Sequence, residues 1–443
     1  MSLLSVKKKT MQCQVKTLYF LALLIISFCS SGVQAEEVNW ESFSSPKMEI
    51  EAHSSAQGEV ISSYIPFFQE IGHMLWSWDP AKELKKTSES VLIEPSMSGL
   101  NELMKNLFVE FDVSNTQNFR KVWFKPTSDL KFRGLLGLHD LNKKRPLIIL
   151  RMGVHGNVDE IIAERFLAKI IFEDLGANFL MIESLTSHAY LSKNKNISFG
   201  GVDEGLQTFL ALNEINKSKL NSLIDGVHLL SISMGSHGTF VTAMLDQHNE
   251  QKIKSIVNFC PLINLQPTVE RGLEINLKNA LISLWNVRRL RAVFEKYQND
   301  EKLGEWWKTI FDFKPRFTSA LLEILNRDRK QPLISPSELE ELIPKMKWPK
   351  GFREHLENSQ SFYQLNNFWP YYQGVKTPIM IYTTPKDPLV INKLNSELIF
   401  RGQQPGDFTS LKYHRLENAV HCGLPAVYKW DYIVKLVRDG LVL

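Results

Sequence analysis

The chain has few cysteines and none of the short patterns by which cysteine or histidine commonly binds a metal. Four cysteines occur among 443 residues, and the sequence contains no CxxC, HExxH or HxxEH spacing. A cysteine metal site and a metal-dependent hydrolase of these types therefore have no motif to support them. No metal ligand is predicted.

The sequence also lacks a long apolar run at its N-terminus. The stretch Leu18–Phe28 is well short of the ~20 residues that a membrane-spanning helix needs. Lysines without any acid precede this stretch, and Val33-Gln34-Ala35 follows it with small residues at the outer two positions. This layout is typical of a secretory signal peptide, with a membrane anchor as the alternative. We expect residues 1–35 to be cleaved and the mature protein to be periplasmic or secreted, with no stable membrane span.

Little net charge remains once this segment is removed. Residues 1–35 contain four lysines and no acid, so the formal charge falls from +4 to zero. A neutral protein has no electrostatic attraction for nucleic acid or an anionic membrane surface, and no nucleic-acid partner is predicted. Two cysteines leave with the segment. Cys260 and Cys422 remain, in a compartment where a disulfide between them could persist.

From Lys121 onward, short β-prone runs alternate with helix-compatible segments. The runs expected to be strands are Val122–Phe124, Phe132–Leu136, Pro146–Arg151, Ala177–Ile182, Val227–Ser233, Ser255–Cys260, Pro378–Tyr382 and Leu411–Leu416. The alternation favours an α/β fold with a mostly parallel sheet flanked by helices. Residues 116–262 are expected to be the first part of this core. Residues 36–115, with apolar stretches at 60–78 and 100–111, are expected to form an N-terminal helical extension.

One long stretch, 263–376, interrupts the alternation and separates the first part of the core from the second, 377–443. It contains no convincing strand, whereas apolar residues between Leu273 and Tyr297 recur at gaps of three and four, which is a helical period. Ser335-Pro336-Ser337-Glu338 has the capping-box pattern with proline at the first helical position. The sequence therefore predicts an inserted helical lid.

The sharpest chemical signal is Ser233, which lies between a β-prone run and a helix-compatible stretch in Ser231-Ile-Ser233-Met-Gly235. At a strand-to-helix elbow the nucleophile has a strained backbone, and the residues two positions away must be small so that the chain can fold back. Glycine is usual at both places, and here Ser231 occupies the first. The pattern alone also fits an ordinary turn serine, because chance matches are common.

Order along the chain strengthens this interpretation. On such a fold the acid follows a later strand and the histidine follows the last strand, in the order Ser, Asp, His. Asp387 comes just after an apolar run, and His421 lies in a loop before a final helix-compatible stretch. Taken singly, they could be a turn aspartate and a surface histidine. Together with Ser233 they predict a catalytic triad, in which His237, on the helix after the elbow, and His414, within the last strand, fit worse.

An oxyanion hole needs two backbone N–H donors. One should be that of Met234, directly after the nucleophile. The other should come from Met152-Gly-Val-His-Gly156, which is similar to an HGxxG loop if Met152 takes the place of the histidine. This register makes Val154 the donor, and a register that starts at the later His-Gly pair makes it Asn157. We favour Val154, because the predicted strand ends directly before the loop.

The elbow, the glycine-rich loop, the acid loop and the histidine loop together resemble the serine-hydrolase branch, esterase- and lipase-like, of the α/β-hydrolase superfamily. The resemblance covers about residues 119–443. It implies an eight-stranded, mostly parallel sheet whose first strands are antiparallel, with a lid inserted after the strand that follows the elbow. Ser231 for glycine and Met152 for histidine are departures that leave the subfamily open.

Together with the signal-peptide layout of residues 1–35, the resemblance implies an exported serine hydrolase that cleaves an acyl ester through an acyl-enzyme, without a cofactor. His421 would take the proton of Ser233, and Asp387 would hold the imidazole tautomer. Five of the ten tryptophans fall in the insertion: Trp285, Trp306, Trp307, Trp348 and Trp369. They favour a small-molecule or lipid-like acyl substrate, unless they form the insertion's own core. A peptidase or amidase with the same triad, or a non-catalytic ligand-binding protein on the same fold, are the alternatives.

Overall fold

A computed structural model describes residues 39–51, 102, 105–106, 109–113, 117–154, 156–159, 164–194, 196, 198, 200–272, 323, 325–367, 369–372, 375–385, 387, 389–397, 411–416 and 427–443. The chain divides into two compact units, residues 1–39 and 40–443. All the elements below belong to the second unit. The predicted signal peptide, residues 1–35, lies outside the described residues.

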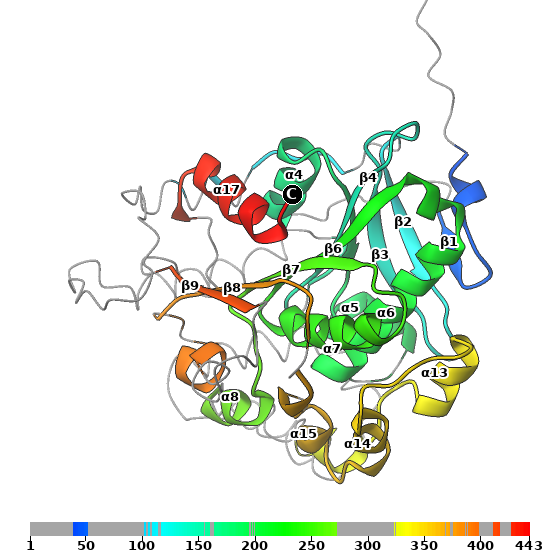
Figure 1. Cartoon of the computed structure of the whole chain (residues 1–443), viewed down its shortest axis with the longest axis vertical. Helices are drawn as coiled ribbons and strands as arrows, with labels where there is room; N and C mark the ends of the chain where they lie inside the picture. The colour runs from blue at the N-terminus through cyan, green and yellow to red at the C-terminus, as the bar shows by residue number, and fades with distance from the viewer. Residues whose placement is uncertain are drawn as a thin grey trace, which may run out of the picture. The chain divides into compact units, whose positions relative to one another are not determined.

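The described strands form one nine-stranded sheet in the order β1-β2-β3-β5-β4-β6-β7-β8-β9 (Figure 1). Their bounds are β1 Met48–Ile50, β2 Phe119–Phe124, β3 Phe132–Gly137, β4 Arg145–Arg151, β5 Asn178–Ile182, β6 Ile224–Ile232, β7 Ile253–Phe259, β8 Ile379–Thr383 and β9 Leu411–Arg415. The pairs from β1 to β5 along this order are antiparallel. All the pairs from β5 to β9 are parallel.

Every predicted strand is confirmed, because each of the eight β-prone runs coincides with one of the strands β2 to β9. These strands form the mostly parallel sheet, antiparallel at its beginning, that the resemblance implied. The additional strand, β1, lies in the predicted N-terminal extension and pairs with β2. Its three residues are too few to show an alternating pattern. The apolar stretch at 60–78 lies outside the described residues, as does half of that at 100–111.

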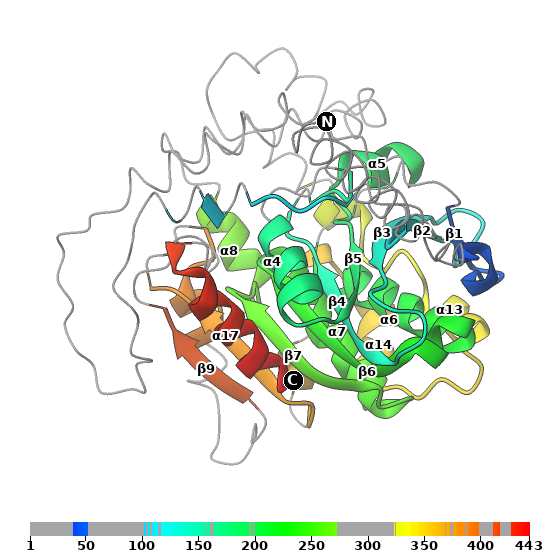
Figure 2. The same cartoon turned by 90° about the horizontal axis from the view of Figure 1, so that it is seen from above.

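Helices cover both faces of the sheet. They are α4 Arg165–Lys169, α5 His188–Asn194, α6 Gly201–Lys217, α7 Met234–His248, α8 Leu265–Gly272, α13 Pro336–Leu342, α14 Phe352–Asn358, α15 Phe362–Leu365 and α17 Trp430–Leu441. Shorter helical turns are η1 Trp40–Phe43, η2 Ile170–Asp174, η3 Lys219–Leu223, η4 Trp369–Tyr372 and η5 Asn392–Leu394. Figures 1 and 2 show α4 and α17 on one face of the sheet and α6 and α7 on the other.

The core follows from the alternation of side chains along the central strands. On β4, Ile148 and Leu150 belong to the cluster that α4 and α17 cover, together with Val257 and Phe259 of β7. The intervening residues face the opposite side, where α7 contacts β4, β6 and β7. Both sets are buried, as expected for parallel strands between two helical layers. Burial on both faces fixes the carboxyl ends of these strands, where the candidate site lies.

The predicted insertion, 263–376, contains only helices and turns among its described residues. The capping box is confirmed: the Ser335 side chain accepts the N–H of Glu338, and the Glu338 carboxylate accepts the N–H of Ser335. The periodic stretch Leu273–Tyr297 lies outside the described residues. Within the described part of the chain, no helix is both long enough and apolar enough to span a membrane.

Candidate active site

Ser233 occupies the turn between β6 and α7, and its backbone is strained. Its φ of 55° and ψ of −119° lie in a region that residues with a side chain rarely adopt. Hydrogen bonds hold this conformation, because Ser233 N donates to Phe259 O at 2.9 Å and Ser233 O accepts from Leu262 N at 3.3 Å. The half-buried serine is therefore fixed against the end of β7. This is the strand-to-helix elbow that the sequence predicted.

The two positions flanking the elbow have different constraints. At Gly235 a Cβ atom would lie 2.6 Å from Met152 O and 2.7 Å from Arg151 O, so only glycine fits there. Ser231 is fully buried, and its Oγ lies 2.5 Å from Asn258 Oδ1 and 2.8 Å from Ser236 Oγ. The sequence indicated only that Ser231 had to be small. Its hydroxyl also ties β6 to β7, a contact that the sequence pattern could not reveal.

The glycine-rich loop after β4 runs beside Ser233. A Cβ atom at Gly153 would lie 3.9 Å from Ser233 Cβ, which puts this residue in van der Waals range of the elbow. A backbone hydrogen bond of 2.9 Å from Gly156 N to Gly153 O closes the loop into a turn. Another, from Met152 N to Ile182 O at 3.3 Å, joins its beginning to β5.

The N–H groups predicted to form the oxyanion hole are those of Met234 and Val154. Neither donates a hydrogen bond to any other described residue. The same holds for the N–H of Asn157, the donor in the other register. Its side-chain oxygen, in contrast, accepts hydrogen bonds from Arg133 and from the N–H of Asp159.

Asp387 follows β8, two strands along the sheet from β6. It is 6% exposed, and its Oδ1 accepts the N–H groups of Leu389 at 2.8 Å and Val390 at 2.9 Å. Its own N–H donates to Thr384 O at 3.3 Å. The carboxylate is therefore held by its own loop at the same sheet edge as Ser233.

His421 lies outside the described residues, as does Cys422. The segment that contains both connects Leu416, whose N–H donates to Thr383 O at 2.7 Å, to Val427 before α17. The chain position of His421, between the last strand and the last helix, is thus the predicted one. Its distances to Ser233 and Asp387 stay untested, and so does the question, left open by the sequence, of a disulfide between Cys422 and Cys260.

The two competing histidines, His237 and His414, both lie within secondary structure elements and outside the loops of the candidate site. His237 is fully buried on α7, and its Nδ1 accepts the N–H of Gly201 at 2.9 Å. Burial lowers the pKa of His237 to about 3, so this side chain is neutral at physiological pH. His414 lies within β9, and burial also lowers its pKa. Neither occupies a loop at the carboxyl edge of the sheet, where a triad base would have to be.

A fully buried amide joins the acid loop to the beginning of the insertion. Asn395 Oδ1 accepts the N–H groups of Ile263 at 2.8 Å and Asn264 at 3.0 Å. Its Nδ2 donates to Thr268 Oγ1 at 3.0 Å and to Ile391 O at 3.0 Å. Asn395 therefore joins the first residues of the insertion to the loop that contains Asp387. No sequence pattern pointed to this residue, because its partners are more than 120 positions away for three of the four contacts.

A buried ion pair lies at the end of β4, directly before the glycine-rich loop. The Arg151 guanidinium, at the end of β4, is 3.5 Å from Glu204 Oε1 of α6, and both side chains are buried. Burial raises the pKa of Glu204 to about 7, against the opposing effect of Arg151. The sequence showed Arg151 only as the end of an apolar strand, so this pair was missed.

The tryptophans of the insertion are only partly described. Trp348 donates from its indole Nε1 to Glu340 Oε1 at 2.8 Å, and its ring lies 6.3 Å from that of Phe352. This tryptophan packs within the insertion, as the core alternative expects. Trp285, Trp306 and Trp307 lie outside the described residues.

Comparison with known proteins gives structural likeness without sequence likeness. No protein-family model and no curated protein matches the chain. An esterase from Pyrococcus furiosus is 13% identical, with a TM-score of 0.43 and coverage of 75% of this chain and 97% of its own. An esterase from Pyrobaculum calidifontis is 10% identical, with a TM-score of 0.41 and coverage of 76% and 88%. A thermostable carboxylesterase cloned from a metagenomic library is 12% identical, with a TM-score of 0.42 and coverage of 77% and 94%.

Likeness at this level carries no argument about activity, and the assignment of the fold comes from the molecule itself. Strands β2 to β9 form the mostly parallel sheet with an antiparallel beginning. The turn from β6 into α7 presents Ser233 in a strained conformation at the carboxyl edge of that sheet. The chain has the α/β-hydrolase fold.

Proposed function

We propose that the protein is a serine hydrolase that cleaves an acyl ester with Ser233, Asp387 and His421. The observation that carries the proposal is the strained Ser233 at the β6–α7 elbow, next to the N–H groups of Met234 and Val154, which donate to no described residue. Strain of this kind is kept at sites where it serves a function. An ordinary turn serine would need neither the strain nor the adjacent donors.

In the proposed mechanism, His421 takes the proton of the Ser233 hydroxyl as the oxygen attacks the ester carbonyl carbon. Negative charge develops on the carbonyl oxygen, and the N–H groups of Met234 and Val154 stabilise it. Collapse of the tetrahedral intermediate breaks the bond to the alcohol, which leaves with the proton from His421. Water then attacks the acyl-serine with the same base, and the carboxylic acid is released. Asp387 keeps the imidazole in the tautomer that both steps require.

We favour Val154 over Asn157 as the second donor. Gly153, the residue before Val154, is adjacent to the Ser233 side chain. The side chain of Asn157 is instead engaged with Arg133 of β3. The first register therefore places the donor directly after Gly153, the loop residue that lies against Ser233.

A fluorophosphonate probe tests the proposal, because it reacts covalently with an activated serine only. Mass spectrometry of the labelled protein should find the probe on Ser233 alone. Ser233→Ala and His421→Ala should abolish both labelling and hydrolysis of p-nitrophenyl esters. Ser222→Ala removes an exposed serine near the start of β6 and should change neither. Label on another serine, or label retained in Ser233→Ala, would overturn the assignment.

The acyl ester is the substrate class that we propose over the amide. A panel of p-nitrophenyl acyl esters and p-nitroanilide peptides separates the two, with faster ester hydrolysis expected. Faster amide hydrolysis would make the protein a peptidase. We also propose that the protein is exported, on the signal-peptide pattern of residues 1–35. N-terminal sequencing of the mature protein should begin at Glu36, and retention of Lys7–Lys9 would contradict this.

A further inference from the structure

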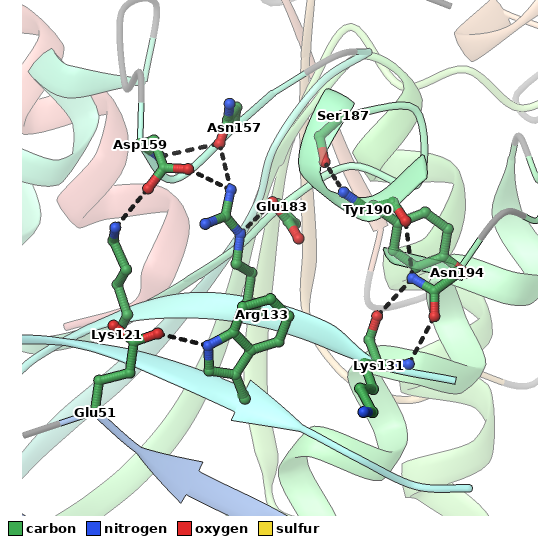
Figure 3. A network of polar contacts seen from close by, with 11 residues as sticks. Glu51, Lys121, Lys131, Arg133, Asn157, Asp159, Glu183, Ser187, Tyr190 and Asn194 are labelled. Carbon is green, nitrogen blue, oxygen red and sulfur yellow. Dashed lines mark hydrogen bonds and ion pairs between the residues drawn. The ribbon is translucent and has the colours of Figure 1, made fainter. Parts of the chain in front are cut away.

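A cluster of charged side chains lies beside the glycine-rich loop and takes no part in the proposed reaction. Its centre is Arg133 of β3, which is 6% exposed. The guanidinium donates from Nε to Glu183 Oε2 at 3.0 Å, and from Nη2 to Asn157 Oδ1 at 2.9 Å and Asp159 Oδ2 at 2.5 Å. Figure 3 shows these three side chains converging on Arg133. A single side chain thus joins β3, the end of β5 and the loop after β4.

A second cation holds the same loop from the neighbouring strand. Lys121 of β2 is 5% exposed, and its Nζ lies 2.6 Å from Asp159 Oδ1. The Asp159 carboxylate therefore binds one cation with each oxygen (Figure 3). The backbone N–H of Asp159 donates to Asn157 Oδ1 at 3.0 Å. The two loop residues are therefore also bound to each other. Residues 157–159 are fixed to β2 and β3 by side chains and not by backbone pairing.

Stability alone is a poor explanation for this cluster. Moving charges out of water is costly, and a buried ion pair often contributes less to folding than apolar residues of the same size. Buried ionic groups instead fix one arrangement of the chain, because any other leaves a charge unpaired. Here the fixed arrangement is that of a loop containing Gly153 and Gly156, residues with more conformational freedom than any others.

The position of that loop bears directly on the proposed oxyanion hole. Gly156, which precedes Asn157, is bound by its N–H to Gly153 O and by its carbonyl to Ser184 N at 3.0 Å. Gly153 is in turn adjacent to the Ser233 side chain. A displacement of residues 157–159 would therefore pass through this short turn to the Val154 N–H. Misplacing a donor by about 1 Å is enough to cost a large part of its effect on the rate.

We propose that Arg133, with Lys121, is a positioning residue for the oxyanion hole, which it sets by clamping Asn157 and Asp159. The inference rests on the proposed function, since it assumes that Ser233 is acylated and that Val154 stabilises the oxyanion. Arg133 touches no reacting atom in this arrangement. Its effect on the reaction passes entirely through the loop.

Replacement of Arg133 should change the transition state and leave substrate binding nearly unchanged. For Arg133→Met we expect kcat for a p-nitrophenyl ester to fall roughly 10- to 100-fold, less than the loss of a whole donor, with KM within about threefold. Arg133→Lys keeps the charge but cannot reach all three partners, so its loss should be smaller. Asp159→Asn weakens both cation contacts and should lie between the two.

Inhibition constants separate positioning from a general loss of structure. The affinity for a boronic acid, whose tetrahedral adduct depends on the oxyanion hole, should fall in parallel with kcat/KM across the three variants. Binding of the carboxylic acid product should change little. A loss of folded protein would lower the active fraction and leave both inhibition constants unaltered.

Asp246→Asn is the matched control. Asp246 is buried and accepts the N–H groups of Lys252 at 3.2 Å and Ile253 at 2.9 Å, at the sheet edge opposite Ser233. The Asp246→Asn variant should have a lower melting temperature than the wild type, with unchanged kcat and unchanged affinity for the boronic acid.

The outcomes distinguish this inference from the proposed function. If the wild-type protein is not labelled at Ser233 by a fluorophosphonate, the proposed function fails and the inference with it. If Ser233 is labelled but Arg133→Met retains kcat within twofold, only the inference is overturned. A kcat loss that Asp246→Asn reproduces at a similar melting temperature also overturns it. Should Arg133→Met not fold, Asp159→Asn, whose side chain is 31% exposed, decides by the same criteria.

Discussion

The backbone N–H of Ser233 donates a hydrogen bond of 2.9 Å to the carbonyl oxygen of Phe259, the last residue of β7. This bond lies across the sheet, between two strands that are themselves paired in register through Ile232 and Phe259. The elbow is thus held by its neighbouring strand, and the strain in its backbone is sustained from outside the turn. The sequence within the turn does not supply this support.

The strain makes glycine preferable to alanine at this position, the reverse of the usual order. Ser233→Ala keeps a side chain at a φ of 55°, whereas Ser233→Gly relieves the clash. We expect the glycine variant to be more stable by about 1 kcal/mol. Urea midpoints at pH 7 measure the difference. The same pair of replacements at Ser222, in the helical turn η3, should favour alanine. Equal or greater stability of Ser233→Ala would contradict the strain argument.

Gly235 and Gly153 provide a contrast between two glycines of the same site. A methyl group at Gly235 would lie within 2.7 Å of two backbone oxygen atoms, and backbone cannot yield without moving β4. Gly235→Ala should therefore cost about 2 to 3 kcal/mol in the free energy of unfolding. Gly153→Ala meets atoms only at 3.7 Å and beyond, so its cost should stay below about 1 kcal/mol. Thermal unfolding of the two variants would refute this if their losses were equal.

Asp387→Asn should lower kcat by about 10⁴-fold through the wrong imidazole tautomer, if the proposed triad is correct. The fold should survive, because the amide oxygen can still accept the N–H groups of Leu389 and Val390. Steady-state kinetics and circular dichroism on the same sample test both parts. Asp246 lies near the C-terminal end of α7, the end away from Ser233. Asp246→Asn is therefore again the buried-carboxylate control, for which we expect a normal kcat. Full activity of Asp387→Asn would remove this residue from the triad.

Asn395→Asp should destabilise the protein although it changes only one group. The carboxylate keeps the acceptors for Ile263 and Asn264 but replaces a donor by a charge facing Thr268 Oγ1 and Ile391 O. Unfolding should become easier by roughly 2 to 4 kcal/mol, the cost of leaving buried polar groups unpaired. The same change at Asn358, an exposed residue, should have an effect within about 0.5 kcal/mol. Comparable urea midpoints for the two variants would contradict the role of Asn395.

His228 should make the stability of the protein depend on pH. Burial lowers its pKa to about 4, while its ring Nδ1 lies 2.8 Å from Ser255 Oγ. Because the folded pKa lies below the unfolded value of 6.5, protons bind the unfolded chain first. The contribution to stability is full above about pH 6.5 and is lost as the pH falls towards 4. His228→Asn removes this titration.

Between pH 7 and pH 4, the free energy of unfolding of the wild type should therefore fall by up to about 3 kcal/mol more than that of His228→Asn. Urea denaturation at half-unit pH intervals measures both losses. A difference between His228→Asn and the wild type that stays constant with pH would show that His228 does not titrate as a buried group.

Much of the sheet could be predicted because burial on both faces of a parallel strand leaves a continuous apolar run. Leu147 to Leu150 and Ile379 to Tyr382 have this character, and both lie in strands. The elbow was predictable for a different reason, since steric demands on Ser231 and Gly235 are local to the turn. The capping box at Ser335 is local as well.

The contacts that hold the site together were not predictable, because each depends on residues far apart in the sequence. Arg133 appeared only as a charged residue within a β-prone run, and its partners Asp159 and Glu183 follow other strands. Asn395 bonds to residues 131 and 132 positions earlier. An apolar pattern reports whether a residue is buried, but it carries no information on which polar partner it meets.

The short strand β1 determines what the edge of the sheet presents to other molecules. Met48, Glu49 and Ile50 pair with half of β2, and Glu49 forms an ion pair with Lys125 at this border. Without them, the backbone of Val122 to Phe124 would be an open edge, the kind of surface on which strands of separate molecules aggregate. The cleavage proposed after Ala35 would leave this cover intact. Proteolysis beyond Ile50 would remove it and open this edge of β2 to edge-to-edge association.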